Sequence, residues 1–566
     1  MRRIRISRTG LALGCALAAA LTGILAGPLL AQDKSGPEPA APATAAAAPA
    51  AAPAAEAQHD QHLHSDMTVP KTAQLLTGYG GGGFAISHAK PAATKFFANG
   101  LELHSAFAHR AALAAMDEAA RLDPACAMCQ WGQALTGGPT INYGKDAKER
   151  EPLLKQALAA RAGAAAAGTP KERALTSALV TRYTPAKDAA MQDRAYAAAM
   201  QQVAAQFPLD DQIAVLTADA LMVAAFTEDG DYDHALLGAC LKLLETVLAR
   251  APEYTPAIHF YIHATEVVGT PELAVPYAEQ LARLAPRASH LVHMPSHTWY
   301  WTGRYQDAAE TNRRAVEIDK ANAKRLGLGP PQGVWGLPYH SHNVIFGLGG
   351  ALMAGDSRTA LDLARPLAEM AAQRSEAEPA TQLLAASGYF ALARFDPASV
   401  MALPQPKLPY LQAAWHYARA ESLIWMGDLA GARQERDAIP AVIAPGKAAD
   451  WPHDGTIAAE QMLGITRAVI GGRVAMAERR WSDAATAFRQ AALVEETKEF
   501  SYFDDPPAFW YPVRRDLAAA LLAAGDAAGA QREAEASLRL RMLDPVAEQI
   551  LAAARAVLTA DSPLLR

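Results

Sequence analysis

The chain has 566 residues, of which 51% are hydrophobic and 19% are charged. This composition excludes a globally disordered protein and supplies enough apolar material for a large core or a long repeat array. The formal net charge of -6 is small for this length, and no block of lysine or arginine follows the first residues. Nucleic acid is therefore not expected as a partner.

The first 31 residues, MRRIRISRTGLALGCALAAALTGILAGPLLA, predict an export signal. A basic start is followed by an apolar run and a small residue, Ala31, which is the pattern of a cleavable signal peptide. The apolar run from Leu11 is also long enough to act as an uncleaved anchor, which is the alternative. We expect a processed protein that is periplasmic or secreted and has no stable membrane span.

Residues 32–92 are predicted to form a linker. Their first part is rich in alanine and proline, a composition that favours an extended tether over a packed core. The stretch HDQHLHSDM follows, in which His59, His62 and His64 either capture a transition metal loosely or belong to a solvated tail. The glycines of GYGGGGF lack the Lys-Ser/Thr pair of a phosphate-binding loop.

From residue 93 to residue 566 the sequence predicts one helix after another. The tetratricopeptide repeat is a two-helix unit of about 34 residues. In FFANGLELHSAFAHRAALAAMDEAARLDP, Gly100, Ala112 and Pro124 match its positions 8, 20 and 32. The same phase returns along the chain, with irregular stretches at 136–171 and 394–411. The predicted fold is all-α: a tetratricopeptide-like α-solenoid of roughly ten helix pairs.

Three histidines share one face of a predicted helix in SHLVHMPSHTWYWTGRY. The repeat phase places His290, His293 and His297 at positions that generally line the concave groove in the tetratricopeptide family. Tyr300 and Trp301 fall at two further groove positions of the same helix. This segment is therefore expected to form one wall of a binding groove.

The preceding repeat carries the same histidine pattern in PAIHFYIHATE. His259 and His263 precede His293 and His297 by one repeat of 34 residues, and Glu266 follows at another groove position. Neighbouring helices pack with their axes about 8–10 Å apart. The two histidine pairs are therefore expected to face each other across one gap.

A third helix, which begins HSHN, adds His342 to the groove, with His340 and Asn343 beside it. This helix follows the insertion KANAKRLGLGPPQGVWGLPY, which is rich in glycine and proline. Its Trp335 and Tyr339 suit a segment that folds over the groove as a lid.

The histidine cluster favours a transition metal over a set of hydrogen-bonded groove residues. Neutral imidazole is a good ligand for copper, zinc or iron. Glu266 has three candidate roles: a ligand, the orienting partner of a ligand, or a general base for catalysis. One tetrahedral ion needs fewer ligands than the cluster offers, so two ions are an alternative. The candidate metal ligands are His259, His263, Glu266, His290, His293, His297 and His342.

Two features qualify this site. Pro295 lies between the histidines and predicts either a helix bend or a later helix start. The candidates for contacting a ligand in the groove are Tyr300, Trp301, His340 and Asn343. Beside a metal-binding protein, two functions stay open: a metal-dependent enzyme, either a hydrolase or a copper or iron oxidase, and a metal-free scaffold that binds a peptide or protein partner in the groove.

The pair of cysteines in CAMC, Cys126 and Cys129, allows three interpretations. In an exported chain the pair forms a short-range disulfide or a soft metal site, and buried free thiols are the third alternative. The next residue is Gln130 and not histidine, which excludes the usual attachment pattern of c-type haem.

Several blocks of the sequence resemble a bacterial family of exported tetratricopeptide-repeat proteins. These blocks are DPACAMCQWGQAL, AIHFYIHATE, SHLVHMPSHTWYWTGRY, YHSHN, WHYARA and DDPPAFWYPVR. The resemblance extends from about Lys95 to Leu538, and the histidine blocks are its specific part. GPTIN stands where the family has a GPNIN-like block, a difference that involves no histidine. The resemblance implies the repeat fold and the position of the site, and it implies no particular activity.

Overall fold

A computed structural model describes the chain except for residues 1–72, 228–231, 330–332, 447–452 and 561–566. The described residues are dominated by helices, and they contain two isolated β-bridges and no named strand. The predicted export signal, the Ala/Pro stretch and the histidine tract at His59, His62 and His64 lie outside the described residues. None of the described helices is long and apolar enough to cross a bilayer.

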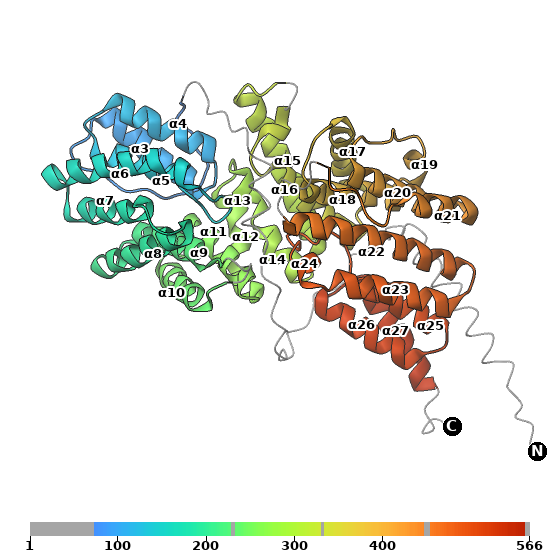
Figure 1. The fold of residues 1–566 in the computed structure, drawn as a ribbon. Coiled ribbons are helices and arrows are strands. Elements are labelled where there is room, and N and C mark those ends of the chain that lie inside the picture. Colours follow the sequence, from blue (N-terminus) through green and yellow to red (C-terminus); the bar gives the residue numbers. More distant parts are fainter. Residues whose placement is uncertain (1–72, 228–231, 330–332, 447–452, 561–566) are drawn as a thin grey trace, which may run out of the picture. The chain divides into compact units, whose positions relative to one another are not determined.

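The chain divides into two compact units, and each is described by itself. The N-terminal unit comprises the described residues of 50–299 and 311–343. Each of its helices α3 to α11 packs against the next one, and α3, α5 and α9 also contact the next helix but one (Figure 1). Its helices are α3 Pro91–Ser105, α4 His109–Leu122, α5 Ala127–Thr136, α6 Ala147–Ala167, α7 Pro170–Tyr183, α8 Ala189–Gln206, α9 Asp211–Ala225, α10 His234–Arg250, α11 Thr255–Val267, α12 Val275–Leu284 and α13 Ser289–His293, with 3-10 turns η1 Pro271–Ala274 and η2 Gly333–Gly336.

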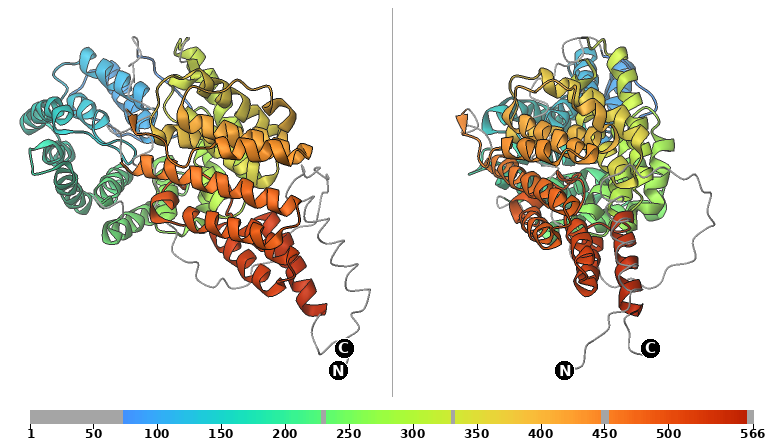
Figure 2. Two further views of the ribbon diagram at one scale, coloured as in Figure 1. Left: turned by 45° about the vertical axis from the view of Figure 1, so that its right-hand side comes forward. Right: turned by 90° about the vertical axis from the view of Figure 1, so that its right-hand side faces the viewer.

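The C-terminal unit comprises residues 300–310 and the described part of 344–566. The helices α14 Pro295–Trp301, α15 Tyr305–Arg325 and α16 His340–Ala354 contribute residues to both units. Both views of Figure 2 show the last helices, in red, side by side, and α26 contacts both α25 and α27. The remaining helices are α17 Ser357–Gln373, α18 Pro379–Phe395, α19 Pro397–Val400, α20 Pro409–Met426, α21 Leu429–Ala438, α22 His453–Ala477, α23 Trp481–Glu495, α24 Lys498–Ser501, α25 Arg514–Ala523, α26 Ala527–Leu540 and α27 Pro545–Ala560.

Local sequence signals explain where many of these helices begin and end. Asp146 and Thr169 each form a capping box with the glutamate three residues later, which satisfies backbone N–H groups at the starts of α6 and α7. Proline in the first turn starts α3, α11 and α20. Gly427 ends α20 in the left-handed region, with a φ of 85°.

The glycine-rich stretch at 78–84 has a structural role in the N-terminal unit. Gly81 N–H donates to the hydroxyl of Thr255 at 2.7 Å, and Gly83 N–H donates to the side chain of Gln212 at 2.7 Å. Gly80 has a φ of 98°, and a Cβ there would lie 2.4 Å from the Thr255 hydroxyl. The glycines therefore allow the backbone to lie directly on α9 and α11.

The predicted fold class is confirmed: the protein is an all-α, tetratricopeptide-like solenoid of successive helix pairs. The irregular stretches also lie where they were predicted. Ten residues separate α5 from α6, and the short α19 interrupts the succession between α18 and α20.

Candidate metal centre

Helix α11 presents His259, His263 and Glu266 from one face, because residues three or four apart lie on the same side of an α-helix. Every residue of α11 from Thr255 to Val267 is buried. The helix therefore runs through the core of the N-terminal unit and carries its polar side chains inside.

The second set of histidines comes from two short helices. Residue Met294 separates α13 from α14, which begins at Pro295. Proline lacks the N–H that would continue a helix. Of the two alternatives predicted for Pro295, the structure has a helix that begins there, but the residues before it form a short helix of their own. His290 and His293 on α13 and His297 on α14 nevertheless approach the histidines of α11.

His259, His263 and His290 form the first triad. The Nε2 atom of His259 lies 3.0 Å from Nε2 of His290 and 3.1 Å from Nε2 of His263. All three side chains are buried. Three ring nitrogens thus converge on one point.

His293, His297 and His342 form the second triad, whose nitrogen donors all lie within 4.8 Å of one another. The Nε2 atoms of His293 and His297 are 2.8 Å apart. The ring of His342 lies 4.6 Å from that of His293, centre to centre. The two triads are neighbours, since the rings of His263 and His297 are 5.6 Å apart.

The partners of the Nδ1 atoms fix the tautomers of three rings. Nδ1 of His259 lies 2.8 Å from the carbonyl oxygen of Ser105, which only accepts hydrogen bonds. Nδ1 of His293 lies 2.6 Å from Oδ1 of Asn312, and Nδ1 of His297 lies 2.8 Å from a carboxylate oxygen of Glu266. Each of these rings therefore carries its proton at Nδ1 and directs an Nε2 lone pair into its triad.

The second triad needs a positive charge between two of its members. With protons at both Nδ1 atoms, the neutral rings of His293 and His297 point two lone pairs at each other over 2.8 Å. This contact is repulsive unless a proton or a metal cation lies between the nitrogens.

Burial disfavours the proton. It lowers the pKa of His259, His290 and His297 well below the usual range, and neighbouring histidines lower it further. Burial likewise lowers the pKa of His293 to about 3, against the opposing hydrogen bond with Asn312. The rings are neutral near pH 7, which is the form that binds metals.

Two aromatic residues cover the first triad. The rings of Phe107 and Tyr339 lie 5.0 Å and 4.4 Å from the ring of His290. Both residues have left-handed backbone, with φ of 51° and 64°, which is unusual for bulky side chains and is held by the surrounding packing. The hydroxyl of Tyr339 accepts from Asn142 at 2.8 Å and pairs with Nε2 of His109 at 3.1 Å.

The predicted groove positions do not leave these histidines accessible. His259, His263, His293 and His297 have 0% of their surface exposed. At the first triad the cover comes from Phe107, which follows α3, and from Tyr339, at the end of the insertion before α16. Within the insertion, Tyr339 packs on His290, and Trp335 packs on His340.

Other predicted groove residues lie elsewhere. Tyr300 and Trp301 belong to the C-terminal unit, where Arg541 lies over the ring of Trp301 at 4.7 Å. Nδ1 of His340 and the amide nitrogen of Asn343 both donate to the carboxylate of Asp319, at 3.0 Å and 2.8 Å. These two residues hold the start of α16 in place beside His342.

Sequence reasoning missed the residues that orient the histidines. Ser105 and Phe107 lie far from the histidine helices in the sequence, and Asn312 and Asp319 lie on α15, the second helix of the repeat that carries His290, His293 and His297. The sequence offered one signal: Asn312 and Asp319 lie on α15, the helix that directly follows the histidine helices in the chain.

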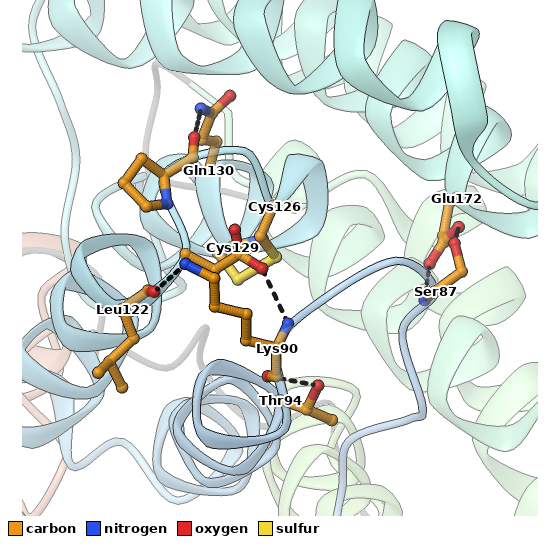
Figure 3. Close-up of a disulfide and its surroundings, with 10 residues drawn as sticks. Ser87, Lys90, Thr94, Leu122, Cys126, Cys129, Gln130 and Glu172 are labelled. Carbon is orange, nitrogen blue, oxygen red and sulfur yellow. Dashed lines mark hydrogen bonds between the residues drawn. A yellow bond between two sulfur atoms is a disulfide. The ribbon is translucent and has the colours of Figure 1, made fainter.

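The cysteines of CAMC form a disulfide (Figure 3). Cys126 precedes α5, and its sulfur accepts a hydrogen bond from the N–H of Cys129 at 3.0 Å. Both residues are buried, so the disulfide fixes the start of this helix. Of the three interpretations of this pair, the structure has the short-range disulfide.

The comparisons with known proteins give no family for this chain. No protein-family model matches it, and no curated protein is similar to it in sequence. Among solved structures, it is similar to yeast Tom70 with a TM-score of 0.28 and 11% identity, over 84% of this chain and 91% of that chain. The TPR domain of P58(IPK) matches with a TM-score of 0.20 and 11% identity, over 83% and 99% of the two chains. The structure of Naa15/Naa10 bound to HypK-THB matches with a TM-score of 0.20 and 12% identity, over 84% and 93%.

Proposed function

We propose that this protein binds transition metal ions, copper, zinc or iron, with one ion in each of the two histidine triads. The observation that carries the proposal is the convergence of ring nitrogens in both triads, in which the Nδ1 protons of His259, His293 and His297 are held by Ser105, Asn312 and Glu266. Metal-bound histidines commonly donate their other N–H to a carbonyl or carboxylate in this way.

The spacing of the donors supports the proposal. Ligand nitrogens at about 2.0–2.1 Å from a tetrahedral ion lie roughly 3.3 Å from each other. The Nε2 separations of 3.0 Å and 3.1 Å in the first triad are close to this value.

A metal-dependent hydrolase is the second candidate function. Three histidines leave one position of a tetrahedral ion open, which is the arrangement of catalytic zinc sites. Glu266 suits an orienting role, because its carboxylate already accepts the proton of His297 Nδ1. A peptide scaffold would have to use other surfaces, since the predicted groove histidines are buried.

A periplasmic or secreted location belongs to the same proposal. The basic and apolar start of the sequence supports export. The Cys126–Cys129 disulfide fits an oxidising compartment.

Elemental analysis of the untagged protein tests the proposal. After incubation with each metal and dialysis against buffer, we expect about two bound equivalents of the preferred metal, one for each three-histidine set. The control for loose metal capture by the N-terminal tract is a variant with His59, His62 and His64 replaced by alanine. It should bind the same number of metal equivalents as the wild type. Well under one equivalent for copper, zinc and iron alike would contradict metal binding.

Glu266→Gln is expected to weaken metal binding about tenfold to hundredfold, because the carboxylate that orients His297 and favours its basicity loses its charge. The matched control is Glu435→Gln. Glu435 makes the same contact with Nδ1 of His416, at 2.7 Å, in the C-terminal unit. Competition with a chelator of known affinity measures both variants, and equal losses of affinity would show that Glu266 has no specific role.

A further inference from the structure

The two histidine triads are neighbours within the N-terminal unit. The rings of His263 and His297 lie 5.6 Å apart, centre to centre, and the rings of His290 and His293 lie 5.6 Å apart as well. His290 and His293 belong to the same short helix, α13, where their positions differ by about 4.5 Å along the helix axis. Two ions held by the two triads would therefore be close enough to contact one small ligand at the same time.

The six ring donors bring no negative charge to such a pair of ions. Imidazole binds metals in its neutral form, so two divalent ions keep their full charges. Glu266 offsets part of this charge, but its carboxylate contacts Nδ1 of His297 and not the Nε2 atom that lies beside His293. Like charges also repel more strongly in a buried site than in water, because the effective dielectric is lower. An anion in contact with both ions offsets this repulsion most directly.

Phe107 closes one side of the first triad. Its ring lies 4.4 Å from the ring of His259, 5.0 Å from that of His290 and 6.1 Å from that of His263. Among the described residues, its ring contacts include all three members of the first triad and no member of the second. The face of an aromatic ring is electronegative and disfavours an anion. The side of the first triad toward the second is therefore the favoured side for an anionic ligand.

His342 provides the access from solvent. It is partly exposed, whereas the other five histidines of the two triads are buried. Its ring lies 4.6 Å from the ring of His293 and 5.6 Å from that of His297. A ligand that enters beside His342 reaches the second triad first. Since the other five rings are buried, we expect room for a ligand of only a few atoms.

We propose that the two triads form one dinuclear centre, in which a single small anion bridges the two metal ions. The anion offsets the repulsion between the ions and occupies the position that three histidines leave open at each tetrahedral ion. The inference rests on the proposed function, because it requires an ion in each triad. It adds the class of ligand that these ions share.

Titration of the copper(II)-loaded full chain with azide tests the proposal. Copper(II) is a suitable probe metal, because a nitrogen site binds it more tightly than the other divalent ions of its row. The absorption band of copper-bound azide should saturate at about one azide for each pair of bound ions, since the two ions share the ligand. Two azides for each pair of ions, or no binding of azide, would overturn a shared ligand.

Electron paramagnetic resonance of the same samples separates coupled ions from independent ones. Two copper(II) ions that share one bridging ligand pair their unpaired electrons, so the azide-bound protein should show far less signal than its copper content. A signal that accounts for all the bound copper would overturn the dinuclear centre and leave the two metal sites standing. Elemental analysis that finds no bound copper would contradict both proposals.

His342→Ala is the variant of choice, because His342 is the least buried member of the triads and its loss should not disturb the core. The ion in the first triad should then give the full signal of an isolated copper ion, with or without azide. His416→Ala is the matched control, since His416 is a partly exposed histidine of the C-terminal unit. It should lose its signal with azide as the wild type does. The same loss of signal in His342→Ala would show that the coupling does not join the two triads.

Discussion

The double substitution His263→Ala with His297→Ala is expected to remove both metal ions from the protein. Each change deletes one nitrogen donor from one triad, and the two remaining donors cannot hold a tetrahedral ion tightly. The deletion in the second triad also leaves Glu266 without the ring that it orients. Elemental analysis after dialysis should fall from about two equivalents to well below one.

The matched control for this variant is His416→Ala with His234→Ala. These two histidines belong to neither triad, and the ring of His416 is already hydrogen-bonded to Glu435. The control should keep the wild-type metal content. Circular dichroism should show wild-type helicity for both double variants, because alanine is the best helix former and the affected helices are held by many other buried residues. A triad variant that is folded and retains two equivalents would place the metal elsewhere.

The repeat period predicted much of the fold because it reports the packing of local helix pairs. The 34-residue echo of His259 and His263 at His293 and His297 correctly paired two helices that face each other. A helix start at Pro295 was one of the two predicted alternatives, and α14 begins there. These signals are local, since each depends only on residue spacing along one or two repeats.

The interior of the site could not be predicted in the same way. The period states which face of a helix points toward the next repeat, but it does not state what covers that face. The cover depends on Phe107 and Tyr339, which take left-handed backbone that no common turn signal predicts for these residue types. Tyr300 illustrates the same limit: it was predicted at a groove position, and in the structure it is buried in the C-terminal unit.

The contacts that orient the histidines join residues whose separations in the sequence do not follow the repeat period. Ser105 lies 154 residues from His259, and Asn312 lies 19 residues from His293. A backbone carbonyl and an amide have no sequence signature as partners of a metal ligand. It is these contacts, however, that fix the tautomers and turn a cluster of histidines into a set of aligned lone pairs.

The free energy of unfolding of the metal-free protein is expected to lose about 3 kcal/mol through His104 alone as the pH falls from 7.5 to 4. Burial, and next the charge of Arg182, lowers the pKa of His104 from 6.5 to about 4. Below pH 6.5 His104 is protonated in the unfolded chain but not in the folded state, so the free energy of unfolding falls until the folded pKa is reached. The Nδ1 of His104 has no hydrogen-bond partner among the described residues that would favour the charged form.

His104→Gln removes this titration and should flatten the pH profile by the same amount, about 3 kcal/mol between pH 7.5 and 4. Urea unfolding of both proteins at several pH values, with a chelator present, measures the difference. Above pH 7.5 the two profiles should run parallel, because His104 is then neutral in both states and any offset reports packing alone. Parallel profiles down to pH 4 would mean that the folded protein protonates His104 as readily as the unfolded chain does, which requires a solvated or anion-paired imidazole in place of the buried one.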